Sequence, residues 1–323
     1  MISRQDFSKK QILVYYPARG DKLACQNDNI VIRDRDNKIK HQSTCYRLFA
    51  LFVVGNTTIT TGLIQRSKKF GFSICFFSMG MKLYEVIGSR MEGNTLLRQR
   101  QYEYKGMELG QRIIENKIYN QRQAINSIRR KTLENKQAIR YLDRQIENLR
   151  QETMPLLSIL GVEGSAAKTY FTEIFDNTSW QGRRPRIKCD YVNTALDIGY
   201  TVLFHVIDAI LNIYGFDTYY GVLHRCFYMR KSLVCDIMEP FRPVIDLEVR
   251  KAINLRQIKE EDFDVYDHRV VLKWKKSSEY TGLFMEAVLE HKEEIFEYIQ
   301  SYYRKFMKGA KAEEFPFFCL MGE

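Results

Sequence analysis

The feature that most constrains the fold is a change in hydrophobic spacing near residue 95. Before it, short apolar or alternating runs such as QILVYY and YRLFALFVV are separated by turn-forming clusters such as RGD and DRDNK, a pattern typical of strands. After it, apolar residues recur at intervals of three and four, as in amphipathic helices. The sequence therefore predicts an α+β protein, with a small β-rich N-terminal domain at residues 1–93 and a larger all-α domain at residues 94–323.

Local signals predict elements within each part. In the first, a short helix begins after residues 56–61 and ends near Lys69, with Gly71 as its stop, and FSICFFS and KLYEVIG form a closing hairpin. In the second, two antiparallel helices turn near Thr132. Further helices are expected at residues 164–175, 192–214, 232–252 and 280–307.

Composition narrows the class of protein. Fifty Lys and Arg against 39 Asp and Glu leave a net charge of +11, which favours a polyanionic partner, either nucleic acid or an anionic membrane surface, although a merely basic soluble protein remains open. Seven scattered cysteines without Cys-x-x-Cys spacing indicate reduced cytosolic thiols. The apolar runs are too short or too interrupted to span a bilayer, and the N-terminus lacks a signal core. We therefore expect a cytoplasmic protein without a membrane segment.

A pair of acids stands in the apolar stretch VCDIMEP. Asp236 and Glu239 are three residues apart, so on a helix they project from one face. Like charges in an apolar setting need a compensating positive group, either a divalent cation or a salt bridge to Arg242 or Arg230. Pro240 and Pro243 remove the helical bonds to the carbonyls of these acids. The helix is therefore expected to loosen and bend at the acids.

Two further residues complete a candidate metal site. His224 closes the aromatic turn GFDTYYGVLH, and Glu163 stands among small residues at an expected helix start, where the helix dipole also accounts for a carboxylate. Together with Glu239, they offer oxygen, nitrogen and oxygen ligands, which suit Mn²⁺ or Mg²⁺. A structural histidine and a surface acid remain the alternatives.

A basic connection, GRRPRIK at residues 182–188, precedes the helix expected at 192–214. Its closely spaced cations suit phosphate contact, and an exposed loop is the alternative. Candidate DNA-binding residues in the chain are Arg184, Arg186, Arg225, Arg230, Lys231 and Arg242.

Several segments, in order, resemble the motifs of the CRISPR adaptation integrase, the universal spacer-acquisition family. They are VVGNTTITTGLIQRSKKFGFSICFFS, NKIYNQ, EGSAAKTYF, RRPRIKCDYVNTALDIGYTVL, GFDTYYGVLHR and SLVCDIMEPFRPVID. The resemblance covers most of the chain and implies a β-rich dimerisation domain joined to a helical catalytic domain.

Carried over residue by residue, the family's metal ligands fall on Glu163, His224 and Glu239, with Asp236 as a neighbouring active-site acid. The resemblance implies that Mg²⁺ or Mn²⁺ supports transesterification, in which the 3′-hydroxyl of a short captured DNA attacks a CRISPR repeat. It also implies double-stranded DNA as substrate, a homodimer or higher assembly, and a small ferredoxin-fold adaptation partner as a candidate. A stand-alone metal-dependent DNA endonuclease and a non-catalytic DNA-binding scaffold are the rival hypotheses.

Overall fold

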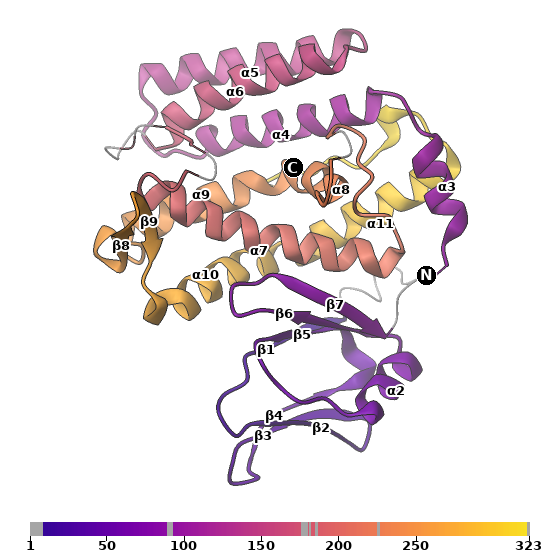
Figure 1. Cartoon of the computed structure of the whole chain (residues 1–323). Helices are drawn as coiled ribbons and strands as arrows, with labels where there is room; N and C mark the ends of the chain where they lie inside the picture. The colour runs from indigo at the N-terminus through magenta and orange to yellow at the C-terminus, as the bar shows by residue number, and fades with distance from the viewer. Residues whose placement is uncertain are drawn as a thin grey trace. The chain divides into compact units, whose positions relative to one another are not determined.

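The computed structural model divides into two compact units, residues 1–95 with 208–216, and residues 96–207 with 217–323 (Figure 1). The smaller unit is rich in strands and the larger one is mainly helical, so the predicted α+β class is confirmed. The structure describes residues 9–88, 93–175, 180, 182–184, 187–224 and 227–321.

Two sheets form the smaller unit. The apolar run LFALFVV is strand β5 (Leu48–Val54), which pairs in parallel with β1 on one side and β6 on the other. It is buried along its whole length, as expected of a central parallel strand whose two faces are both covered. β7 pairs with β6 in the antiparallel sense, which confirms the predicted hairpin. The first sheet is β1 (Gln11–Tyr15), β5 (Leu48–Val54), β6 (Ser73–Phe77) and β7 (Leu83–Gly88), and the second is β2 (Lys22–Gln26), β3 (Asn29–Arg33) and β4 (Ile39–Thr44).

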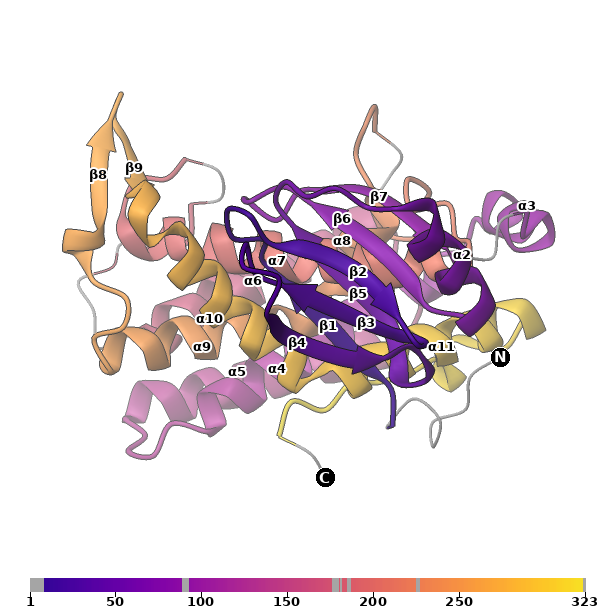
Figure 2. The ribbon, with the colours of Figure 1, turned by 90° about the horizontal axis from the view of Figure 1, so that it is seen from below.

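The two sheets lie as layers over one apolar core, with helix α2 (Thr61–Phe70) beside them (Figures 1 and 2). Leu63 of this helix joins the core, and Gly71 ends the helix in the left-handed conformation, with φ of 71°, as predicted. The strand β4 was not predicted. Its sequence IKHQST is polar and mostly exposed, so it carries no apolar alternation.

Three helices, α4, α5 and α6, pack against one another in the larger unit (Figure 1). The turn between the first two falls at Thr132, whose hydroxyl oxygen accepts a bond from Asn135 N at 3.1 Å and caps α5. The helices are α3 (Thr95–Glu103), α4 (Glu108–Asn126), α5 (Leu133–Gln151), α6 (Leu156–Ile174), α7 (Tyr191–Tyr214), α8 (Ser232–Met238), α9 (Arg242–Asn254), α10 (Ser277–Glu290) and α11 (Lys292–Lys308).

Two expectations for this unit were wrong. It is not all-α, because β8 (Phe263–Tyr266) and β9 (Arg269–Leu272) form an antiparallel hairpin. The helix expected at 280–307 is two helices, which meet at His291. Both errors have a local cause, since four-residue strands are too short to give a periodic signal and the apolar pattern continues through the break.

Within the described ranges, α7 alone is long and apolar enough to cross a bilayer by length and composition. Seventy-two per cent of its most apolar window is buried inside the protein, as in the core helix of a folded domain. This is weak evidence for a membrane span.

Candidate active site

Glu163 lies in the middle of α6 and not at its start. The expectation that the helix dipole stabilises its carboxylate was therefore wrong. The helix begins at Leu156, well before the small residues that suggested its beginning. A Cβ added at Gly161 or Gly164 would meet none of the described atoms within 4 Å. The surface of α6 is therefore open at these two glycines.

Lys117 joins two of the predicted ligands. Its side chain, on α4, is only 8% exposed, and its Nζ lies 2.5 Å from Glu163 Oε1 and 2.7 Å from Glu239 Oε2. Burial disfavours the ammonium form, but the charges of Glu239 and Glu163 outweigh it and raise the pKa of Lys117. One buried cation therefore brings the two carboxylates to the same place.

Glu239 also pairs with Arg242, whose Nε lies 2.9 Å from Oε2. Burial alone would raise the pKa of Glu239, but Arg242 and Lys117 lower it to about 2. The salt bridge that stood as the alternative to a metal ion is thus present in the structure. Both cations contact the same oxygen, Oε2, and a hydrogen bond from Lys117 also helps to lower the pKa of Glu239.

The loosening of the helix predicted at the acids is confirmed. Helix α8 ends at Met238, a 3₁₀ turn covers Glu239–Phe241, and α9 begins at Arg242. The carbonyls of Asp236 and Glu239 accept bonds from the N–H groups three residues later, because prolines occupy the positions four residues later.

His224 is held by Asp236. Its Nδ1 lies 2.6 Å from Asp236 Oδ1, and the fully buried carboxylate also accepts the backbone N–H groups of Val222, Leu223 and His224 at 2.6, 3.1 and 3.0 Å. Burial opposes protonation of the imidazole, but the hydrogen bond and charge of Asp236, with the charge of Glu239, raise the pKa of His224. Asp236 thus positions the loop and the ring, and leaves Nε2 available as a ligand.

The structure therefore brings the three predicted ligands into one cluster. Glu163 and Glu239 share Lys117, and the charge of Glu239 interacts with that of His224. Across the described part of the chain, no three His, Cys, Asp or Glu side chains are arranged to hold a metal ion directly. The donor chemistry still fits Mg²⁺ or Mn²⁺, because two carboxylates lie near an imidazole that is oriented by a third carboxylate.

The basic residues differ in their surroundings. Arg242 is committed to Glu239, and its guanidinium lies 4.7 Å from the centre of the Tyr200 ring. Arg184 is exposed, whereas Arg230 and Lys231 are half-buried beside the start of α8. Arg186 and Arg225 lie outside the described residues.

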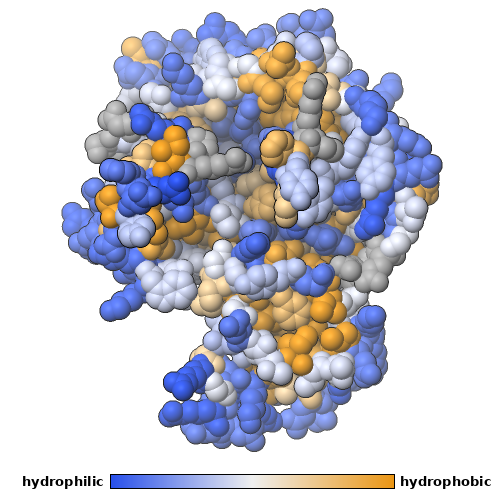
Figure 3. All heavy atoms as spheres, viewed as in Figure 1, coloured by the Kyte–Doolittle hydropathy of each residue, from blue (hydrophilic) through white to orange (hydrophobic). Residues whose placement is uncertain are grey.

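Hydrophilic side chains cover much of the visible surface of the helical unit (Figure 3).

The connection at residues 182–188 is anchored on α7. Arg183 pairs with Asp197 at 2.5 Å and donates to Asn193 Oδ1 at 3.0 Å, so this cation is engaged within the protein. Arg184 also contacts Asn193, but through its backbone N–H, which leaves its side chain at the surface.

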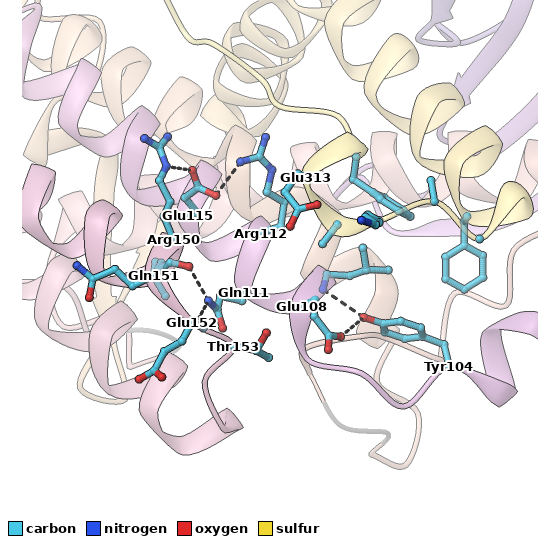
Figure 4. A pocket seen from close by; sticks show the side chains of 18 of the residues that line it. Tyr104, Glu108, Gln111, Arg112, Glu115, Arg150, Gln151, Glu152, Thr153 and Glu313 are labelled. Carbon is cyan, nitrogen blue, oxygen red and sulfur yellow. Dashed lines mark hydrogen bonds and ion pairs between the residues drawn. The ribbon is translucent and has the colours of Figure 1, made fainter.

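A cavity of 1180 Å³ lies elsewhere in the helical unit, between the start of α4, the end of α5 and the segment after α11 (Figure 4). Charged side chains that line the cavity form ion pairs with one another. Glu115 accepts from Arg112 at 2.7 Å and from Arg150 at 2.6 Å, and Gln111 donates to the carbonyls of Leu149 and Glu152. We assign no reaction to this cavity.

The fold and the site define a class of α+β protein whose helical unit carries a carboxylate–histidine cluster beside basic side chains. The chain belongs to the Cas1 family of CRISPR-associated proteins, because the family model for CRISPR associated protein Cas1 matches residues 14–286. The family resemblance drawn from the sequence is thereby confirmed.

Relatives and solved structures agree with this assignment. The chain is 30% identical over 223 residues to "CRISPR-associated endonuclease Cas1 1" of Thermodesulfovibrio yellowstonii, a match that covers 65% of this chain and 70% of that one. It shares its fold with a chain of a partial Cas6-RT-Cas1–Cas2 complex, with TM-score 0.78, 22% identity and coverage of 96% and 98%. A casposase bound to integration product gives TM-score 0.69 and 18% identity, with 97% and 96% covered.

Lys117 was missed as a site residue, although the sequence contains a signal for it. It lies four residues after Ile113 and next to Ile118, both buried, so the helical period places it on the apolar face of α4. A lysine at such a position needs a buried anionic partner.

Proposed function

We propose that this chain is a metal-dependent spacer integrase, which joins the 3′-hydroxyl ends of short captured DNA to repeat phosphodiesters by transesterification. The observation that carries the proposal is the convergence of Glu163, Glu239 and the Asp236-bound His224 from separate parts of the chain. The endonuclease names of the relatives and the family assignment support it.

Glu163, His224 and Glu239 would hold Mg²⁺ or Mn²⁺. Such an ion, when bound, supplies polarisation of the phosphoryl oxygen and favours deprotonation of the attacking hydroxyl. Asp236 keeps the His224 ring in one orientation and tautomer through Nδ1. Arg242 keeps the buried Glu239 ionised, as a ligand oxygen must be. Arg184, Arg230 and Lys231 would neutralise phosphates of the bound DNA.

The proposal also includes the DNA and protein partners with which the chain would assemble. Double-stranded DNA is the substrate, both as the captured fragment and as the repeat, and the β-rich N-terminal domain would mediate dimerisation. A solved neighbour in fold is described as part of a Cas6-RT-Cas1–Cas2 complex. A small adaptation partner of the ferredoxin fold is the corresponding candidate for this chain.

A strand-joining assay tests the function. Labelled DNA with a free 3′-hydroxyl is incubated with a repeat-containing plasmid and Mn²⁺, and covalently joined products are resolved on a denaturing gel. Wild type should join the strands, and His224→Ala should abolish joining while duplex binding stays within about twofold. Full joining by His224→Ala, or joining unaffected by exhaustive chelation, contradicts the proposal.

Two rivals have specific support. The relatives' names favour an endonuclease, which would cut the plasmid without forming joined products. The ion pairs of Glu239 with Lys117 and Arg242 are those expected of a non-catalytic DNA-binding scaffold. Calorimetric titration with Mn²⁺ separates the scaffold from both enzymes, because binding that Glu239→Ala weakens requires a metal site.

A further inference from the structure

Two buried asparagines on α4 have no part in the mechanism described above. Asn116 and Asn120 lie in the motif NKIYNQ, one helical turn apart, and both side chains are fully buried. A carboxamide both donates and accepts hydrogen bonds, and a buried one that lacks partners costs stability. The partners of the two asparagines therefore show which parts of the fold these side chains hold.

Both asparagines bind the backbone of the segment that follows α11. Asn116 Nδ2 donates to Phe318 O at 2.7 Å, and its Oδ1 accepts from Phe318 N at 2.9 Å. Asn120 Nδ2 donates to the same carbonyl at 3.0 Å, and its Oδ1 accepts from Leu320 N at 2.9 Å. We name residues 316–320 the strap, because these bonds fasten the segment to α4.

Asn120 also reaches the turn that carries Glu239. Its Nδ2 donates to Pro240 O at 3.0 Å. In a 3₁₀ turn such a carbonyl accepts from the N–H three residues later, but that residue is Pro243, which has no N–H. The carboxamide of Asn120 therefore supplies a donor that the turn itself lacks.

Helix α4 thus holds two consecutive residues of this turn. Lys117 and Asn120 are three residues apart, so they lie on one face of the helix. Lys117 contacts the carboxylate of Glu239, and Asn120 contacts the carbonyl of Pro240. The ion pair attracts the carboxylate, whereas the hydrogen bond is directional and fixes the backbone from which that carboxylate extends.

The strap packs against the same turn. The ring of Phe318 is only 5% exposed, and its centre lies 4.4 Å from that of Phe241, the last residue of the 3₁₀ turn. Asn120 therefore binds the backbone of two packed segments, the turn and the strap. The geometry of a metal ligand depends on supporting contacts of this kind.

We propose that Asn120 is a positioning residue for metal binding, which fixes the turn of Glu239 against the strap. The inference rests on the proposed function and names a further residue on which that function depends. Asn120 acts through the backbone of Glu239 and should therefore change the affinity for the ion. Asn116, whose described contacts in this region are with the strap, should change stability.

The test compares the Mn²⁺ affinities of Asn120→Ala and Asn116→Ala by calorimetric titration. The two residues are matched, because both are buried on α4 and bound to Phe318, while the described hydrogen bond to the Glu239 turn comes from Asn120. Both variants should melt at a lower temperature than wild type. Asn120→Ala should bind Mn²⁺ about 10- to 100-fold more weakly, and Asn116→Ala should stay within about twofold of wild type.

Strand joining gives a second readout. Joining by Asn120→Ala should rise towards that of wild type as Mn²⁺ is raised above its dissociation constant, and the KM for DNA should stay within about twofold of wild type. Circular dichroism at the assay temperature establishes that each variant is folded. If Asn120→Ala does not fold, Asn120→Ser and Asn116→Ser, which keep a shorter hydrogen-bonding side chain, replace the alanine pair.

Equal Mn²⁺ affinity in the Asn120 variant and wild type, or equal losses of affinity in the two asparagine variants, overturns the inference. Failure of both Asn120 variants to fold also overturns it, because Asn120 would then serve stability alone. If wild type binds Mn²⁺ and joins strands in these cases, the proposed function stands without Asn120. The absence of Mn²⁺ binding and of joining by wild type rejects that function itself.

Discussion

Lys117 Nζ lies 2.7 Å from Glu239 Oε2, and the same ammonium contacts Glu163. A buried lysine therefore supplies the positive charge that buried Glu239 requires, and it also pairs with the half-buried Glu163. Any divalent ion that binds these acids has to compete with this ammonium, which makes Lys117 the first residue to change.

Lys117→Met should destabilise the metal-free protein by about 3 kcal/mol or more, because the variant leaves the two carboxylates without their shared cation. Mn²⁺ should then raise the melting temperature of the variant more than that of wild type, since the ion no longer competes with the ammonium. Differential scanning calorimetry with and without Mn²⁺ measures both effects.

Lys168→Met provides the control, because it removes an exposed lysine from the same helix as Glu163. Its stability should change by less than about 0.5 kcal/mol. Equal Mn²⁺ responses in Lys117→Met and wild type would show that the ion does not bind at these acids.

Asp236→Asn should lower the pKa of His224, because it removes the negative charge that holds the imidazolium. The folded-state pKa of His224 is raised, so its stabilisation is complete below about pH 6.5 and is lost as pH rises through the raised value. The variant should consequently lose more stability, relative to wild type, at pH 5.5 than at pH 8.5. NMR titration of the imidazole signals, with His224→Ala to assign the resonance, checks the direction.

Glu239→Gln should cost roughly 3–5 kcal/mol at pH 7, because Arg242 loses its buried anionic partner and Lys117 keeps only Glu163. The pKa of Glu239 is lowered to about 2 from an ordinary 4.5, so its contribution is complete above pH 4.5 and is lost as pH falls towards 2. The difference between wild type and variant in urea unfolding should therefore shrink from pH 5 to pH 3. In the control Glu261→Gln, a surface pair, the change should be about 0–1 kcal/mol at every pH.

Arg184→Ala should weaken DNA binding, whereas Arg242→Ala should first weaken the fold. Arg184 is exposed, so its loss should reduce the slope of log affinity for DNA against log salt by about 0.9 and leave unfolding unchanged. Arg242 is paired with buried Glu239, so its loss should first lower the free energy of unfolding. Salt-dependent anisotropy and urea unfolding, made on the same preparations, separate the two roles.

Much of the fold could be predicted because its signals are local. The spacing of apolar residues distinguished the two parts of the chain, Gly71 marked a helix end, and Pro240 marked the break in the helix at the acids. The polar strand β4 and the four-residue strands β8 and β9 gave no such signal, because their pairing depends on partners that a window of sequence does not contain. His224, Asp236 and Glu239 were singled out by their local context and by the order of the family motifs, but the contact in which Asp236 holds His224 was not predicted.

The sequence by itself determined most of the element types, the α+β class, the family and the acids and histidine worth examining, since periodicity, prolines and motif order are properties of neighbouring residues. Only the tertiary structure decided that Asp236 holds His224, and that Lys117 and Arg242 neutralise Glu239. The physical reason is that a buried charge is stabilised by whichever opposite charge packing brings within about 3 Å, and packing joins residues far apart in the chain.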